Sequence, residues 1–242
     1  GEAANIIGTT ATLSAIDGIG STDDIDTNIT TLAATNTGAS GNIQINEIAT
    51  GTDIDVNNIS QTNGSGIGNI LLTTENGTIK VLSSGTGVTT AGSGTITLTA
   101  AGTTSDVLVN QVVTSTTGQI QINAARDITN SAIISATGAG VIDLNAANDI
   151  NQNADITSAD GNITADATTG AITMADGTKT DSGSGTIAYT AGTDVALSIL
   201  SSTNTVDVTA GTVGVTGAIT DILSGEAANI IGTTATLSAI DG

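Results

Sequence analysis

The chain has 242 residues, no Cys, His, Pro, Phe or Trp, and 3 basic against 23 acidic residues, which give a net charge of −20. So few basic side chains argue against nucleic acid and anionic membranes as partners, because neither set of phosphates could be neutralised. Without cysteine there are no disulfides or thiolate metal sites, and no apolar run approaches the roughly 18 residues of a membrane-spanning helix.

The first 18 residues, GEAANIIGTTATLSAIDG, return unchanged at residues 225–242, an offset of 224 residues. We call this sequence the duplicated segment. A window slightly longer than one unit of a tandem array contains such a copy. We therefore interpret residues 1–224 as one repeat unit and residues 225–242 as the start of the next identical unit.

Acidic residues gather after the first copy of the duplicated segment. Two D-x-D-x-N stretches, at 24–28 and 53–57, match the opening of an EF-hand calcium loop. Both lack the glycine at position six and the glutamate at position twelve of that loop. A solvated acidic face explains both stretches without metal. Calcium remains the only cofactor to consider, with Asp23, Asp24 and Asp26 as its candidate ligands.

A shorter repeat fills the rest of the unit. Its pattern is a small residue, a variable residue, apolar-x-apolar, a polar residue and often Ala. Such alternation predicts a strand with one buried face, and units too short to bury that face alone predict a solenoid. Seven copies begin at Gly41, Gly68, Gly94, Gly118, Gly140, Gly161 and Gly185, and a degenerate copy begins at Val206. We expect an all-β parallel β-helix with about ten coils of about 22 residues, each coil advancing the axis by ~4.8 Å.

Aligning the copies assigns a role to each position. The first apolar residues are expected to form an inner ladder, and the second apolar residues a parallel one. A polar column should bond from coil to coil, a small column should mark a tight corner, and an Asp should begin a second strand. The second ladder comprises Ile45, Leu72, Leu98, Ile122, Leu144, Ala165 and Tyr189, the polar column Asn46, Thr73, Thr99, Asn123, Asn145, Asp166 and Thr190, the small column Ala100, Ala124, Ala146, Ala167, Ala191 and Ala210, and the Asp set Asp53, Asp106, Asp127, Asp149 and Asp194.

Catalytic and cofactor-binding residues are not predicted. Arg126 is the only arginine beside a carboxylate, and we interpret it as neutralising the Asp106, Asp127 and Asp149 column. The lone tyrosine, Tyr189, is expected to face inward and so offers no platform for a sugar ring. A regular T-x-T array for binding ice is also missing, and the glycine motifs precede no helix that could hold a phosphate.

The G-x-I-x-[IL]-[NT]-A units, with LSAIDGIGSTDDIDTNITTLAA at residues 13–34 and SGNIQINE at residues 40–47, resemble known repeats. They are similar to the β-solenoids of filamentous-haemagglutinin-like adhesins and giant bacterial surface proteins. The resemblance covers residues 19–223. It implies a parallel, usually right-handed β-helix and an extracellular or cell-surface location in bacteria.

These observations predict a secreted structural protein that forms a fibre, stalk or surface layer. Its expected partner is itself, through continuation or end-to-end stacking of units, with cell-surface polysaccharide as the other expected partner. Two alternatives stay open. One is an adhesin that binds a glycan or a surface receptor, and the other, less favoured, is a polysaccharide-degrading β-helix enzyme.

Overall fold

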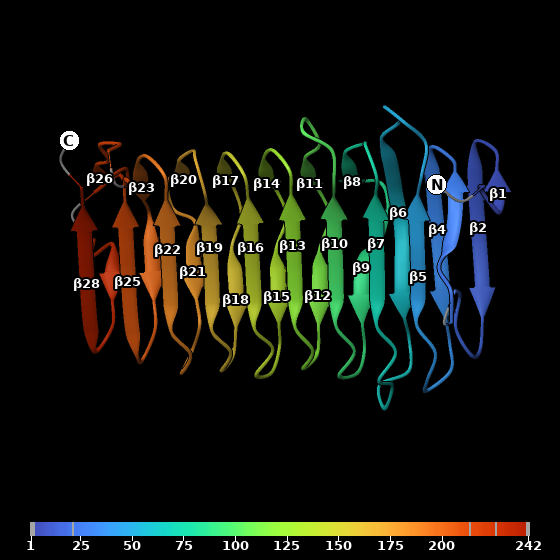
Figure 1. Cartoon of the computed structure of the whole chain (residues 1–242). Helices are drawn as coiled ribbons and strands as arrows, with labels where there is room; N and C mark the ends of the chain where they lie inside the picture. The colour runs from blue at the N-terminus through green and yellow to red at the C-terminus, as the bar shows by residue number, and fades with distance from the viewer. Residues whose placement is uncertain (1–2, 21, 213, 226, 241–242) are drawn as a thin grey trace.

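The computed structural model describes residues 3–20, 22–212, 214–225 and 227–240, which contain strands and turns but no helix. The strands stack along one axis, with the two ends of the chain toward opposite ends of the stack (Figure 1). Pairing between neighbouring coils is parallel throughout the strands named below. The predicted fold class, an all-β parallel β-solenoid, is confirmed.

Two sheets form the walls of the solenoid. Sheet A takes one strand from each coil: β1 (Ile6–Ile7), β3 (Ile25–Asn28), β5 (Ile43–Glu47), β7 (Ile70–Thr74), β10 (Ile96–Ala100), β13 (Ile120–Ala124), β16 (Ile142–Ala146), β19 (Ile163–Ala167), β22 (Ile187–Ala191), β25 (Thr205–Ala210) and β28 (Thr234–Ala239). Sheet B takes one long strand or two short strands: β2 (Thr10–Ala15), β4 (Thr31–Asn36), β6 (Ile54–Gln61), β8 (Ile79–Val81), β9 (Gly87–Thr90), β11 (Val107–Val109), β12 (Val113–Ser115), β14 (Ile128–Asn130), β15 (Ile134–Ala136), β17 (Ile150–Gln152), β18 (Ile156–Ser158), β20 (Ile172–Met174), β21 (Lys179–Asp181), β23 (Val195–Leu197), β24 (Ile199–Ser201), β26 (Ile219–Asp221) and β27 (Ile230–Ile231).

The stack makes about nine turns, compared with the ten expected from the sequence. The difference lies between β25 and β3 of a following unit, where the sequence count assigned two whole coils. Short copies of the repeat elsewhere fall one to a coil, as expected. The predicted right hand of the coil stays a prediction.

The expected inner ladders are present in sheet A. The first apolar residues pair from coil to coil, beginning with Ile43 against Ile70 and ending with Ile187 against Val206. The second apolar residues pair in the same register, and Ala165 lies beside Tyr189. Nearly all of these side chains are completely buried. Stacked aliphatic side chains therefore supply the core that aromatic rings supply in most domains of this length.

Glycine at the start of each repeat is required by close approach between coils. A Cβ atom at Gly118 would collide with the carbonyl oxygen of Gly94, and one at Gly94 would collide with that of Gly68. The same collision recurs along one corner of the solenoid. It affects Gly68, Gly94, Gly118, Gly140, Gly161 and Gly185.

Aspartate and asparagine side chains link successive coils at the corners. The Oδ1 atom of Asp127 accepts a hydrogen bond from the backbone N–H of Asp149 in the next coil, at 3.0 Å. In each of these bonds a side chain accepts from the following coil, so it replaces a sheet hydrogen bond where the chain turns. The other pairs are Asp53–Thr78, Asp106–Asp127, Asp149–Ala171, Asp194–Ala218, Asn69–Thr95 and Asn162–Thr186. The Asp set does begin the second strand of its coils, as predicted, but this bonding role was not foreseen.

The outer polar column and the small column also lie where the repeat placed them. Asn145 donates to Asn123 at 3.1 Å, and Asn123 donates to Thr99 at 3.2 Å, so part of the expected polar ladder forms. Ala100 pairs with Ala124, and the small column is buried along its length. In two earlier coils Glu47 and Thr74 occupy the same position.

Candidate assembly interface

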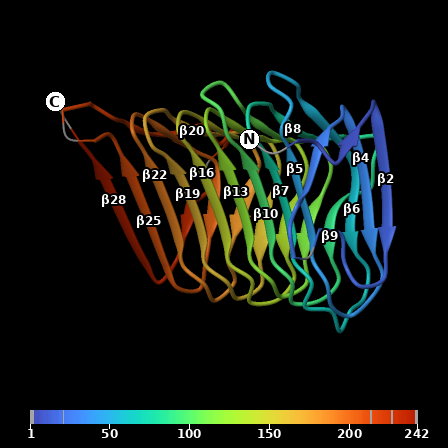
Figure 2. The same ribbon diagram turned by 45° about the vertical axis from the view of Figure 1, so that its right-hand side comes forward.

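The first and last strands are the most exposed parts of the solenoid. The order of sheet A ends at β28, whose six residues are all exposed, and begins at β1, where Ile7 is 78% exposed. Figure 2 shows β28 and β2 at opposite ends of the stack. The outer edge of a terminal strand offers free N–H and C=O groups to another strand. The two ends are therefore the natural surfaces for continuation or stacking.

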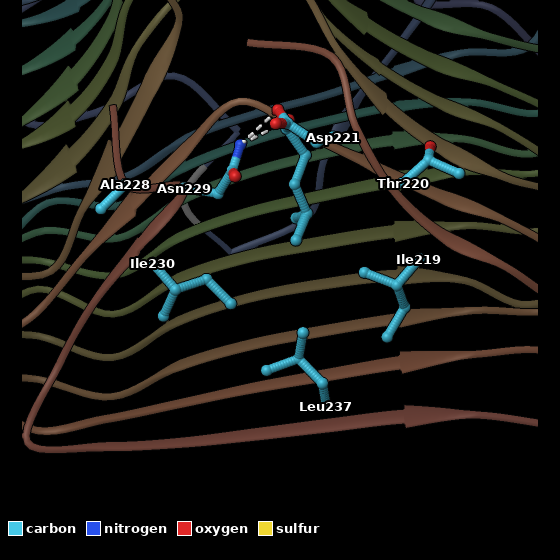
Figure 3. A pocket seen from close by; sticks show the side chains of 8 residues that line it. Ile219, Thr220, Asp221, Ala228, Asn229, Ile230 and Leu237 are labelled. Carbon is cyan, nitrogen blue, oxygen red and sulfur yellow. Dashed lines mark hydrogen bonds between the residues drawn. The ribbon is translucent and has the colours of Figure 1, made fainter. Parts of the chain in front are cut away.

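An apolar cavity of about 340 Å³ opens at the C-terminal end. Ile219, Ile230 and Leu237 point toward one another across it (Figure 3). The inner ladders of both sheets run into this hollow, because Leu237 pairs with Val208 and Ile230 with Leu200. Leu237 is 51% exposed. The core of the solenoid thus stops at this end without a cover among the described residues.

Polar groups close one side of this cavity. The Nδ2 atom of Asn229 donates to Oδ1 of Asp221 at 2.8 Å and to the carbonyl oxygen of Ser198 at 3.0 Å. The backbone N–H of Leu200 donates to the carbonyl oxygen of Asn229 at 2.7 Å. These bonds hold β27 on the last complete coil and leave the apolar floor of the cavity facing outward.

The three candidate calcium ligands are not gathered into a site. Asp26 lies in β3, is 3% exposed, and accepts a hydrogen bond from Asn46 Nδ2 at 3.1 Å. Asp23 is exposed and Asp24 is half-buried, both ahead of β3. In the part of the chain that the structure describes, no group of three or more acidic residues could hold a metal ion. Calcium binding stays a prediction.

Each basic side chain is paired with acids on the outer walls. Arg126 contacts Asp106 and lies 3.1 Å from Asp127, two of its three predicted partners. Lys80 lies 2.6 Å from Asp53. Partial burial acts to raise the pKa of Asp53, but the hydrogen bond from Lys80 and that from Thr78 outweigh it and leave the pKa below its usual value. These pairs are stabilising contacts of the wall.

A column of hydroxyl side chains that the sequence did not reveal runs along sheet B. The strands that carry it are mostly three residues long, too short for alternation to stand out. Some neighbours bond directly, as Thr157 donates to Ser135 at 3.0 Å, and a hollow of about 350 Å³ lies over this part of the column. In register order the column is Ser14, Thr35, Ser60, Thr89, Thr114, Ser135, Thr157, Asp181 and Ser201.

Buried polar residues were also missed. Glu47 is completely buried, and its Oε2 atom accepts from Thr27 Oγ1 at 2.7 Å and from the backbone N–H of Ile29 at 3.1 Å. Its place in the Ala column could have drawn attention to it in the sequence. These bonds satisfy the carboxylate within the wall, so the residue acts as a corner clamp.

Compared with protein-family models, curated proteins and solved structures, the chain matches none of them. Within the described ranges no helix is long and apolar enough to cross a membrane. The similarity to haemagglutinin-like repeats therefore remains at the level of the solenoid fold, which the structure shows independently.

Proposed function

We propose that this chain is a structural unit of an extracellular β-solenoid that forms a fibre, stalk or surface layer at the bacterial cell surface. The observation that carries the proposal is the uncovered C-terminal end, where strand edges and an apolar cavity coincide. A following unit or a second copy would pair with the edges and fill the cavity.

The interior supports the same proposal. Every coil joins the next through sheet hydrogen bonds, stacked aliphatic ladders and the corner bonds of Asp and Asn. Since these contacts all run parallel to the axis, adding a unit repeats an interface that the solenoid already uses along its length. The acidic outer walls keep the assembly hydrated and discourage lateral aggregation.

Electron microscopy of the purified chain and of native surface material tests the proposal. We expect filaments or extended rods, and we expect Leu237→Asp to shorten or abolish them, because a carboxylate would be buried at the joint. Ile133→Asp is the matched control, since Ile133 is 46% exposed but lies away from both ends. Filaments that persist with Leu237→Asp, or native material made only of isolated short rods, would contradict the proposal. Labelling of intact cells tests the surface location.

The hydroxyl column favours a second candidate, an adhesin that binds a glycan along sheet B. Hydroxyl and carboxylate side chains at a regular axial spacing can exchange hydrogen bonds with sugar hydroxyls. Binding of the chain to a panel of cell-surface polysaccharides would support this alternative, and a uniformly negative panel would remove it.

A further inference from the structure

The two copies of the duplicated segment do not occupy equivalent places. The sequence TATLSA forms β2 in sheet B at residues 10–15 but β28 in sheet A at residues 234–239. The preceding Ile-Ile pair likewise forms β1 in sheet A and β27 in sheet B. In Figure 1 the arrow of β2 points down and that of β28 points up. One sequence is therefore accepted by two different sites.

The two placements fix the number of coils in the repeat. Nine steps along sheet A lead from β1 to β25, and the chain then crosses to sheet B before the second Ile-Ile pair. The offset of 224 residues thus spans nine and a half coils. At ~4.8 Å per coil, one unit advances the axis by roughly 46 Å.

We propose that consecutive units share a single copy of the duplicated segment and join with their sheets exchanged. Sheet A of one unit then continues as sheet B of the next, and the next unit is rotated by about half a turn around the axis. This inference rests on the tandem arrangement of the proposed function. The partner is a second copy of the same unit, docked through its β3 and β4.

Inward side chains agree between the two sites. In β28, Ala235 and Leu237 stack on Val206 and Val208 of the preceding coil. The equivalent residues in β2, Ala11 and Leu13, stack on Leu32 and Ala34 of the following coil. One shared strand would accordingly continue both inner ladders, with Ala against the larger Leu32 and Leu against the smaller Ala34.

Hydrogen-bonding groups of the segment are divided between the two sites without competition. Asn5 uses its N–H and its Oδ1 toward Asp26 in the following coil, each at 2.8 Å. The equivalent Asn229 uses its carbonyl oxygen toward Leu200 and its Nδ2 toward Leu197 and Ser198 in the preceding coil. A single asparagine can make both sets at once, because each set uses different atoms.

The next corner shows the same division. Thr9 accepts on its carbonyl oxygen from the N–H of Thr30, at 3.0 Å, on the following side. The equivalent Thr233 donates its N–H to the carbonyl oxygen of Asn204, at 2.9 Å, on the preceding side. The free edge of β28 is thus the edge that β2 uses to bind β4.

A tandem chain in which residues 19–242 follow directly on Gly242 tests the joint. Ser238 is equivalent to Ser14, which pairs with Thr35 in β4. With exchanged sheets, Ser238→Cys in the first unit and Thr35→Cys in the second should form a disulfide under mild oxidation, because neighbouring strands bring the Cα atoms within bonding range. The chain has no native cysteine to interfere.

The matched control combines Ser238→Cys with Asp26→Cys in the second unit. In sheet A, Ser238 continues the column of Thr209, and Asp26 begins that column beside Asn46. A disulfide in this pair would show that sheet A continues as sheet A, which would overturn the inference. Failure of both pairs in chains with unchanged unfolding midpoints would also overturn it.

Fibre images give an independent readout. With exchanged sheets the same face returns only every second unit, at roughly 91 Å, whereas a straight joint repeats it at roughly 46 Å. The covalent tandem chain reports on the joint even if native material forms no filaments, so the two proposals fail separately.

Discussion

Single residues decide how closely successive coils approach. The glycine column places backbone against backbone at one corner, where even a methyl group would meet a carbonyl oxygen of the preceding coil. These glycines do not share a left-handed conformation, since positive φ values occur at other glycines of the chain with the exception of Gly41. Their role is steric, and the motif spacing in the sequence is the spacing of this contact.

Gly118→Ala should accordingly destabilise the solenoid by about 1–3 kcal/mol, because the added methyl group must displace backbone. Gly64→Ala is the matched control. The nearest atom to its added Cβ would be the carbonyl oxygen of Ala91 at 3.7 Å, which is ordinary contact. Urea unfolding of both variants measures the difference, and equal midpoints would refute the steric role.

At the scale of elements, a buried polar cluster ties three strands together. Tyr189 in β22 donates to Gln152 in β17 at 2.6 Å and bonds Thr180 in β21 at 2.6 Å. Thr180 replaces an aliphatic residue in its column, where it pairs with Ile156. The cluster makes one register favourable among coils that otherwise present nearly uniform aliphatic ladders.

Burial raises the pKa of Tyr189 well above its usual value, and the hydrogen bond with Thr180 offsets this only in part. The raised pKa implies that the unfolded chain releases this proton first, so stability is complete below about pH 10 and falls as pH rises further. Tyr189→Phe should cost about 1 kcal/mol at neutral pH and flatten the alkaline decline. Thermal unfolding from neutral to alkaline pH measures both effects. Lys80 and Lys179 titrate alike in both proteins, so an unchanged alkaline decline would exclude Tyr189 as its source.

Strands of sheet A were predictable because five residues suffice to show alternation and a glycine marks each start. The two-part coils of sheet B were only half visible. Their Asp-Ile starts were recognised, but three-residue strands such as β15 carry a single outward side chain. The hydroxyl column therefore emerged only from the register. The joint was misjudged for another reason, since an identical sequence suggests an identical place, yet β2 and β28 face different neighbours.

For the whole molecule, the net charge of −20 is spread over a thin solenoid with only three cations to balance it. Self-repulsion among the carboxylates opposes compaction, while hydrogen-bonded ladders resist it. Salt shortens the range of this repulsion to ~10 Å at 0.1 M. Stability should therefore depend on ionic strength more than on any one acidic residue.

Raising sodium chloride from about 10 to 150 mM should increase the melting temperature by roughly 2–6 °C, equivalent to about 1–2 kcal/mol. Calcium and magnesium at equal concentration should then give equal increases, because the described acidic residues form no metal-holding group. Differential scanning calorimetry checks both statements. A calcium-specific increase that Asp24→Asn removes would instead locate a site at the Asp23, Asp24 and Asp26 candidates.

The corner bonds have one further consequence. Each runs from a side-chain oxygen in one coil to a backbone N–H in the next, as Asn69 does toward Thr95, and the observed series keeps this direction. One end of a unit therefore presents acceptors where the other presents donors. Any polymer of such units is directional: its two tips are chemically distinct, subunits add to them at different rates, and two fibres cannot fuse tip to identical tip.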